Sequence, residues 1–89
     1  MKKKLLITGG SGYLGINLAL TLKKKYKVFI GSRNQKRNYD ASKQTGCEAI
    51  PLDVTNINSI RDALIYCKPD VIIHAAATKF VDISEKFPF

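Results

Sequence analysis

Apolar runs and helical patterns alternate along the first half of the chain. Residues Lys3 to Thr8 contain a short run of leucine and isoleucine, which predicts a buried strand ending in a glycine cluster. Leucines at positions 14, 18 and 22 have the spacing of one helix face, and we expect this helix to end near Lys25. A second apolar run at 28–30 favours another strand, which Gly31 should end.

The second half of the chain continues this alternation. Residues 32–46 are polar and are expected to contain one short helix within 35–44. A third strand is predicted over 48–52 and a fourth over 71–73, running into His74. Between them, Asn56 has the side chain of a helix N-cap, and Pro69 should block the helix that follows. The apolar stripe of that helix consists of Ile57, Ile60, Ala63, Leu64 and Cys67. Residues 81–86 are predicted to begin a further helix.

Strands that alternate with helices in this way predict a parallel sheet with right-handed crossovers. The strands are continuous apolar runs, which is typical of a sheet covered by helices on both faces. The sequence contains no internal repeat and no low-complexity linker. We therefore expect residues 1–89 to form one α/β domain.

Composition narrows the class of protein. With 89 residues, of which 45% are hydrophobic and 25% charged, the chain can form one small domain with a core. No stretch approaches the ~20 apolar residues that span a bilayer, so we expect no membrane partner. Cys47 and Cys67 lack metal-ligand spacing, and we expect no metal site. They are predicted to be buried thiols in a reducing, cytoplasmic compartment.

Positive charge suggests an anionic partner. Fifteen Lys and Arg residues against seven Asp and Glu give a net charge of +8. Two lysine groups, at 2–4 and 23–27, are interpreted as solvated ends of elements, the second beside the negative end of a helix dipole. The third group, Arg33, Lys36 and Arg37, is interpreted as functional. Aromatic residues are not interleaved with these groups, which argues against a nucleic-acid partner.

Residues 8–15, Thr-Gly-Gly-Ser-Gly-Tyr-Leu-Gly, join the first strand to the first helix. In this context, three spaced glycines predict a loop that binds a dinucleotide pyrophosphate. Gly9 would allow the tight turn, Gly12 would let the pyrophosphate approach the backbone, and Gly15 would let the helix pack against the sheet. The predicted cofactor-binding residues of this loop are Gly9, Ser11, Gly12, Tyr13, Leu14 and Gly15. A Walker-type loop is excluded because no Gly-Lys-Ser/Thr follows.

The end of the second strand favours NADP over NAD as the cofactor. An NAD site has a carboxylate about 20 residues after the glycine loop, where it binds the ribose hydroxyls. Here that place holds Arg33, and the first acid is Asp40. An arginine can instead pair with the 2′-phosphate of NADP, with Ser32, Lys36 or Arg37 nearby. NAD stays the alternative, as does a merely solvated basic loop.

At these residues the chain resembles the extended short-chain dehydrogenase/reductase superfamily. The family pattern Thr-Gly-x-x-Gly-x-x-Gly is matched from Thr8 to Gly15, and segments 52–55, 69–74 and 75–77 are also similar. The resemblance implies the N-terminal half of a Rossmann fold, with about four parallel strands in the order 3-2-1-4 and helices on both faces. The further cofactor contacts that it implies are Asp53 and Val54 near the adenine, and Ala75 and Ala76 along the dinucleotide.

Two groups of nucleotide-sugar enzymes share further segments with the chain. Residues 74–79 resemble the inverting nucleotide-sugar 4,6-dehydratases of surface-polysaccharide biosynthesis, in which Lys79 would lie beside the cofactor loop. Residues 52–55, 68–72 and 81–82 resemble the dTDP-4-dehydrorhamnose reductases. The resemblance therefore implies the NADP-binding portion of a nucleotide-sugar dehydratase, epimerase or reductase.

The catalytic Tyr-x-x-x-Lys pair of these enzymes follows the fourth strand and its helix, beyond the end of this sequence. Tyr39 and Lys43 have the same spacing, but they lie between the second and third strands, and we interpret them as a chance match. His74 is interpreted as a structural histidine. We therefore assign no catalytic residue and expect no turnover from this chain by itself. A nucleotide sugar would bind only together with the missing C-terminal part.

Two further expectations concern the form of the protein. The alternative function is a stand-alone dinucleotide-binding or regulatory module that is naturally this short. The predicted fourth strand carries no proline or lysine within 71–73, and an unguarded sheet edge pairs with other chains. We therefore expect a homo-oligomer.

Overall fold

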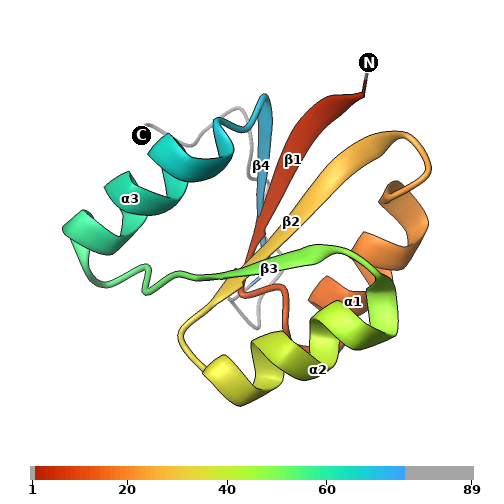
Figure 1. Cartoon of the computed structure of the whole chain (residues 1–89), viewed down its shortest axis with the longest axis horizontal. Coiled ribbons are helices and arrows are strands. Elements are labelled where there is room, and N and C mark those ends of the chain that lie inside the picture. Colours follow the sequence, from red (N-terminus) through yellow and green to blue (C-terminus); the bar gives the residue numbers. More distant parts are fainter. Residues whose placement is uncertain (1, 76–89) are drawn as a thin grey trace.

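Strands and helices alternate throughout residues 2–75, the part of the chain that the computed structural model describes (Figure 1). The elements are β1 (Lys3–Thr8), α1 (Tyr13–Leu22), β2 (Tyr26–Ser32), α2 (Gln35–Thr45), β3 (Glu48–Pro51), α3 (Ile57–Cys67) and β4 (Val71–His74). Their order confirms the prediction, and the bounds of β1 are those expected. The helix predicted at 81–86 lies outside the described residues.

The four strands form one parallel sheet in the order β3-β2-β1-β4, which confirms the predicted topology. β1 is central, pairing Leu5 with Val28 of β2 on one side and with Val71 of β4 on the other. Its apolar side chains are 0–1% exposed, because strands flank it and helices cover it. This burial on both faces explains why the apolar run of β1 does not alternate with polar residues.

Helices cover both faces of the sheet, with α1 and α2 on one side and α3 on the other (Figure 1). Each face has its own core cluster, because neighbouring side chains of a strand point to opposite sides. The cluster beneath α1 and α2 contains Leu5, Ile7, Ala19, Val28, Ile30, Ala41 and Cys47. The cluster beneath α3 contains Leu6, Phe29, Ile50, Leu52, Ala63 and Cys67. Both cysteines are buried free thiols.

Two predicted boundaries were wrong. α1 ends at Leu22 rather than near Lys25, because the pairing of β2 with β1 already begins at Tyr26 and the three lysines between them form the turn. Gly31 does not end β2 but lies within it, paired with Thr8 and Ile50 on its two sides. A Cβ on Gly31 would lie 2.7 Å from Leu52 Cδ2, so glycine is needed there for packing.

α2 is longer than the short helix expected, with 11 residues and a cap at each end. The Asn34 side chain accepts a hydrogen bond from the Arg37 N–H, and Gly46 ends the helix in the left-handed conformation at φ 77°. Its buried residues are Asn38, Ala41 and Thr45. Their spacing marks a helix face, but two of the three are polar, and an apolar stripe was therefore not visible in the sequence.

α3 begins after the predicted cap, since the Asn56 side chain accepts hydrogen bonds from the N–H groups of Asn58 and Ser59. The predicted apolar stripe is only partly buried. Ala63 and Cys67 lie in the core, whereas Ile57, the first residue of α3, is 79% exposed. Within residues 2–75, no helix is long and apolar enough to cross a membrane. The same residues contain no group of three or more side chains that could hold a metal ion.

Candidate functional site

A groove of about 510 Å³ lies at the carboxyl ends of the central strands, where parallel α/β sheets bind ligands. The glycine loop forms one wall, and the turn from β2 to α2 forms the other. The residues that line it are Gly9, Ser11, Gly12, Ser32, Arg33, Asn34, Arg37 and Ala75. Of the predicted cofactor-binding residues, the structure therefore brings together Gly9, Ser11, Gly12, Arg33 and Ala75.

Gly9 makes the turn off β1 and ties the loop to β2. Its φ of 72° lies in the left-handed region that favours glycine. The N–H of Gly9 donates to the carbonyl of Gly31 over 2.6 Å, and the N–H of Gly10 donates to the same carbonyl over 3.3 Å. These bonds hold the loop against the end of β2, so both walls of the groove keep a fixed spacing.

Gly12 is the N-cap of α1 and leaves the start of that helix open. It has no side chain to cap the helix, and the first turn carries no acidic residue. The N–H groups of the first turn, Tyr13 to Gly15, have no acceptor within the helix. A Cβ on Gly12 would meet Gly9 O at 3.8 Å and no nearer atom, so the space beside it is open to a ligand. Such a helix start attracts an anion.

Gly15 and Gly10 pack against each other at the base of the loop. A Cβ on Gly15 would lie 2.3 Å from the Cα of Gly10, closer than atoms can approach. Gly15 therefore packs α1 against the loop rather than against the strands, which refines its predicted role. A Cβ on Gly10 would in turn lie 2.7 Å from Ile30 Cγ2. We assigned no role to Gly10 from the sequence. A sign of one was that the loop contains a fourth glycine besides the three spaced ones.

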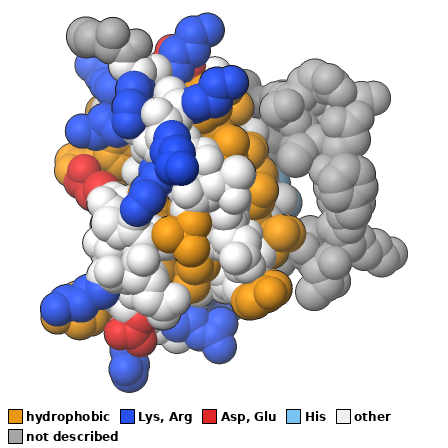
Figure 2. Space-filling model, turned by 90° about the vertical axis from the view of Figure 1, so that its right-hand side faces the viewer, with side chains coloured by type: hydrophobic (Ala, Val, Ile, Leu, Met, Phe, Trp, Pro, Cys, Tyr) orange, Lys and Arg blue, Asp and Glu red, His pale blue; other side chains and the backbone are white. Residues whose placement is uncertain are grey.

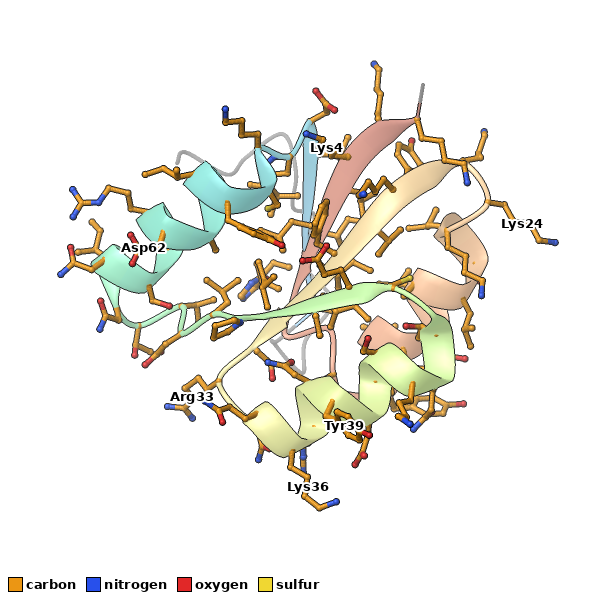
Figure 3. All side chains as sticks on the ribbon, viewed as in Figure 1. Lys4, Lys24, Arg33, Lys36, Tyr39 and Asp62 are labelled. Atoms are coloured by element: carbon orange, nitrogen blue, oxygen red, sulfur yellow. The ribbon has the colours of Figure 1, made fainter. Side chains whose placement is uncertain are left out.

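Arg33 stands at the end of β2 with an exposed side chain (Figure 3). Before it, Ser32 anchors the turn: its hydroxyl contacts the Ser11 hydroxyl over 2.9 Å and accepts the Asn34 N–H over 3.2 Å. Arg37, one turn into α2, lines the same groove.

Lys36 does not share the position of these arginines. It lies outside the groove lining and forms an ion pair with Asp40 at 3.5 Å. The first acid after β2 is thus engaged in an ion pair on α2. Among residues 2–75, no acidic residue lines the groove. The wall formed by the β2–α2 turn is therefore positively charged.

Asp53 and Val54 follow β3 and do not line the groove. The Asp53 carboxylate accepts hydrogen bonds from the hydroxyl and N–H of Thr55, at 2.6 and 2.9 Å. These bonds hold the pKa of Asp53 below its ordinary value, and the charge of Arg33 adds to them. Val54 instead lines a separate apolar cleft of about 230 Å³ between α3 and the sheet.

The other predicted site residues fall into three groups. The Ala75 N–H donates to the Thr8 carbonyl over 2.8 Å, which places Ala75 beside the glycine loop. Ala76 and Lys79 lie outside the described residues. Tyr13 and Leu14 are exposed on the first turn of α1, and neither they nor Gly15 line the groove.

His74, Tyr39 and Lys43 were not assigned to the site, and the structure places them elsewhere than the groove lining. His74 Nδ1 lies 2.5 Å from the Thr8 hydroxyl, in contact between the ends of two strands. The Lys43 ammonium lies 5.2 Å from the centre of the Tyr39 ring, on the outer face of α2 (Figure 3). That contact gives the tyrosine and lysine a local partner within their own helix.

Lysines gather at the opposite end of the molecule from the groove, where β1 begins (Figure 2). Lys2, Lys4, Lys23 and Lys27 line a broad hollow there. Lys2 Nζ donates to the Lys23 carbonyl at the end of α1, and Lys23 Nζ donates to the Thr45 carbonyl at the end of α2. Cations thus meet the negative ends of two helices.

Comparisons with known proteins agree with this architecture. The family model of the NAD-dependent epimerase/dehydratase family matches residues 5–88. A GDP-6-deoxy-D-talose 4-dehydrogenase from Aggregatibacter actinomycetemcomitans is 35% identical over 86 residues, which are 97% of this chain and 25% of that protein. The chain thus spans about a quarter of the length of this curated relative.

Solved structures show the same fold. A short-chain dehydrogenase from Bacillus anthracis has a TM-score of 0.77 at 24% identity. The match covers 89% of this chain and 36% of that protein. A variant of actinorhodin polyketide ketoreductase, solved with NADPH, has a TM-score of 0.76 at 19% identity, covering 82% and 32%. With sequence, sheet order and glycine loop in agreement, the chain belongs to the NAD-dependent epimerase/dehydratase family.

Proposed function

We propose that this protein binds NADP(H) in the groove between the glycine loop and the β2–α2 turn. In this proposal it supplies the cofactor-binding portion of an enzyme that modifies a nucleotide sugar. The observation that carries the proposal is the pairing of an open helix start at Gly12 with a positively charged wall at Arg33 and Arg37. The helix start at Gly12 fits a pyrophosphate, and the wall at Arg33 and Arg37 fits an additional phosphate.

The residues present fit the pyrophosphate. The N–H groups at the start of α1 face outward without a side-chain cap, and the helix dipole adds positive potential there. Gly12 keeps the approach to these groups open, because a larger side chain would project into the groove. In the proposed complex these backbone groups bind the pyrophosphate, and Ser11 lies at its side.

The choice of NADP over NAD rests on the charge of the β2–α2 turn. A carboxylate there would bind ribose hydroxyls and repel a 2′-phosphate, but within the described part of the chain the groove is lined by two arginines and by no acid. A guanidinium can form two parallel hydrogen bonds with a phosphate. Arg33 is the first candidate because it directly follows β2, and Arg37 is the second because it faces the same groove.

The nucleotide-sugar part of the proposal rests on family membership and on the relative from Aggregatibacter. A bound nicotinamide dinucleotide would supply hydride exchange with a sugar carbon. In this proposal, the residues of the groove hold the adenosine and pyrophosphate portion of the cofactor and so orient it. We assign no acid or base to residues 2–75. The groups that act on the sugar would come from other parts of the enzyme.

Arg33→Ala is expected to weaken the binding of NADP⁺ selectively. Loss of a charged hydrogen bond costs ~1.5–3 kcal/mol, or roughly 10- to 100-fold in the dissociation constant. The affinity for NAD⁺, which lacks the 2′-phosphate, should change by less than about threefold. Calorimetric titration with each cofactor measures the ratio of the two dissociation constants directly.

Arg61→Ala is the matched control for this variant. Arg61 lies on α3, where its guanidinium donates to Asn58 Oδ1 at 2.8 Å, and it does not line the groove. Its replacement removes the same charge and should leave the preference for NADP⁺ unchanged. Equal affinity of the unmodified protein for the two cofactors would contradict the proposed NADP site.

A further inference from the structure

Asn38 is a polar residue on the buried face of α2. It is 7% exposed and shares the face that packs on the sheet with Ala41 and Thr45. Neither the glycine loop nor the groove lining includes it. A buried amide on a packing face costs free energy unless its hydrogen bonds are made, so its contacts show what holds it there.

The amide of Asn38 joins the carboxyl ends of two strands. Its Nδ2 donates to the carbonyl of Ser32 in β2 over 2.9 Å and to the carbonyl of Ile50 in β3 over 3.2 Å. The Ser32 carbonyl also accepts the N–H of Leu52 over 3.0 Å. Asn38 therefore fixes the peptide group that directly precedes Arg33.

The same peptide controls both walls of the groove. The Ser32 hydroxyl contacts the Ser11 hydroxyl of the glycine loop and accepts the Asn34 N–H. A shift of the Ser32 peptide would move these two contacts and the start of the Arg33 side chain together. The Asn38 amide thus affects the position of Arg33 through the Ser32 peptide, without lying in the groove itself.

The orientation of the amide is fixed by its partners. Both neighbours are carbonyl oxygens, which only accept hydrogen bonds, so the NH₂ group must face them. Oδ1 then points the other way, where it is buried and has no partner among residues 2–75. An unpaired buried acceptor is unfavourable, and a leucine of similar size would avoid it. Packing alone therefore does not account for an asparagine at this position.

We propose that Asn38 is a positioning residue that sets the preference of the groove for NADP(H), by holding the Ser32 peptide so that Arg33 faces the 2′-phosphate. The inference rests on the proposed NADP site. It assigns the preference to two residues in different places: Arg33 binds the phosphate, and Asn38 fixes the strand end that carries Arg33.

The test uses Asn38→Leu, with Ser42→Ala as the matched control. Leucine keeps the buried volume and removes the two hydrogen bonds. Ser42 makes a comparable bond from the other end of α2, since its hydroxyl donates to the carbonyl of Cys47, the residue before β3, over 2.8 Å. In calorimetric titrations, Asn38→Leu should weaken NADP⁺ binding about fivefold and NAD⁺ binding less than about twofold. Ser42→Ala should leave their ratio unchanged.

A second measurement does not depend on the cofactor. The backbone amides of Asn34 and Leu52 donate to the Ser32 hydroxyl and carbonyl. Their hydrogen exchange should become faster in cofactor-free Asn38→Leu and stay unchanged in Ser42→Ala, because the first variant releases the Ser32 peptide. A purely structural role for Asn38 would lower both affinities equally or neither, whatever happens to the local exchange. That result would overturn the inference.

The two proposals can also fail separately. If the unmodified protein prefers NADP⁺ and Asn38→Leu keeps the full preference, the positioning role is wrong and the NADP site stands. If the unmodified protein shows no preference for NADP⁺, both are wrong.

Discussion

Replacing Gly12 with valine is expected to abolish dinucleotide binding while the fold persists. The backbone at Gly12 has φ −85° and ψ 179°, which any residue adopts, and a Cβ there would meet Gly9 O at 3.8 Å and nothing nearer. The backbone of the loop therefore accommodates a Cβ at this position. The groove does not accommodate valine, because the branched side chain would fill the space beside the open N–H groups of α1. We expect the dissociation constant to rise at least about 100-fold, or ~2.7 kcal/mol.

Two measurements on the same samples separate binding from folding in this experiment. Urea unfolding should show a loss of stability within about 1 kcal/mol, which is the scale of an N-cap substitution. Leu20→Val, which places valine on the exposed side of the same helix, should leave cofactor affinity unchanged. Undiminished binding by Gly12→Val would mean that the glycine loop serves the fold alone.

Gly15→Ala, in contrast to Gly12→Val, is expected to destabilise the fold strongly. Glycine to alanine within a helix ordinarily stabilises by ~1 kcal/mol. Here the added Cβ would lie 2.3 Å from the Cα of Gly10 and 2.5 Å from its carbonyl carbon and oxygen. These are backbone atoms of a loop tied to Gly31, so they cannot rotate away. The clash outweighs the gain in helix propensity, so we expect the free energy of unfolding to fall by about 3 kcal/mol.

Gly12→Ala is the control for this substitution, because it makes the same chemical change three residues away in open space. Its urea midpoint should stay close to that of the unmodified protein, whereas the midpoint of Gly15→Ala should fall clearly below it. Coincident unfolding curves for the two alanine variants would show that α1 can move away from the loop, contrary to the packing described above.

Sequence reasoning succeeded where burial on both faces leaves a continuous apolar run. The strand at Leu5 to Ile7 and the parallel sheet were predicted because apolar runs separated by helices allow few arrangements. The strand order, which the structure confirms, was implied by the family resemblance and not by the pattern. The groove was foreseen for a related reason. Spaced glycines after a strand have a specific steric meaning, and the structure brings Gly9 and Gly12 beside Arg33 as expected.

The misses have a common physical cause, which is tertiary packing that leaves little trace in the local pattern. Gly31 looks like a strand end in sequence, but it lies inside β2 because Leu52 packs over it. Asn38 lies in a polar stretch of the sequence, but it is buried, and its amide donates to two carbonyls at neighbouring strand ends. Lys36 and Arg37 are adjacent and equally basic, yet only the arginine lines the groove.

An NMR titration of the ¹⁵N-labelled protein with NADP⁺ shows where on the molecule the dinucleotide binds. We expect saturable shifts of the backbone amides at Ser11, Gly12, Tyr13 and Arg33, in the glycine loop and at the end of β2. The lysine-lined hollow at the other end of the sheet provides the internal comparison, because a protein of charge +8 can attract any anion there. Shifts confined to that hollow, or no saturable shifts at the glycine loop, would contradict the account.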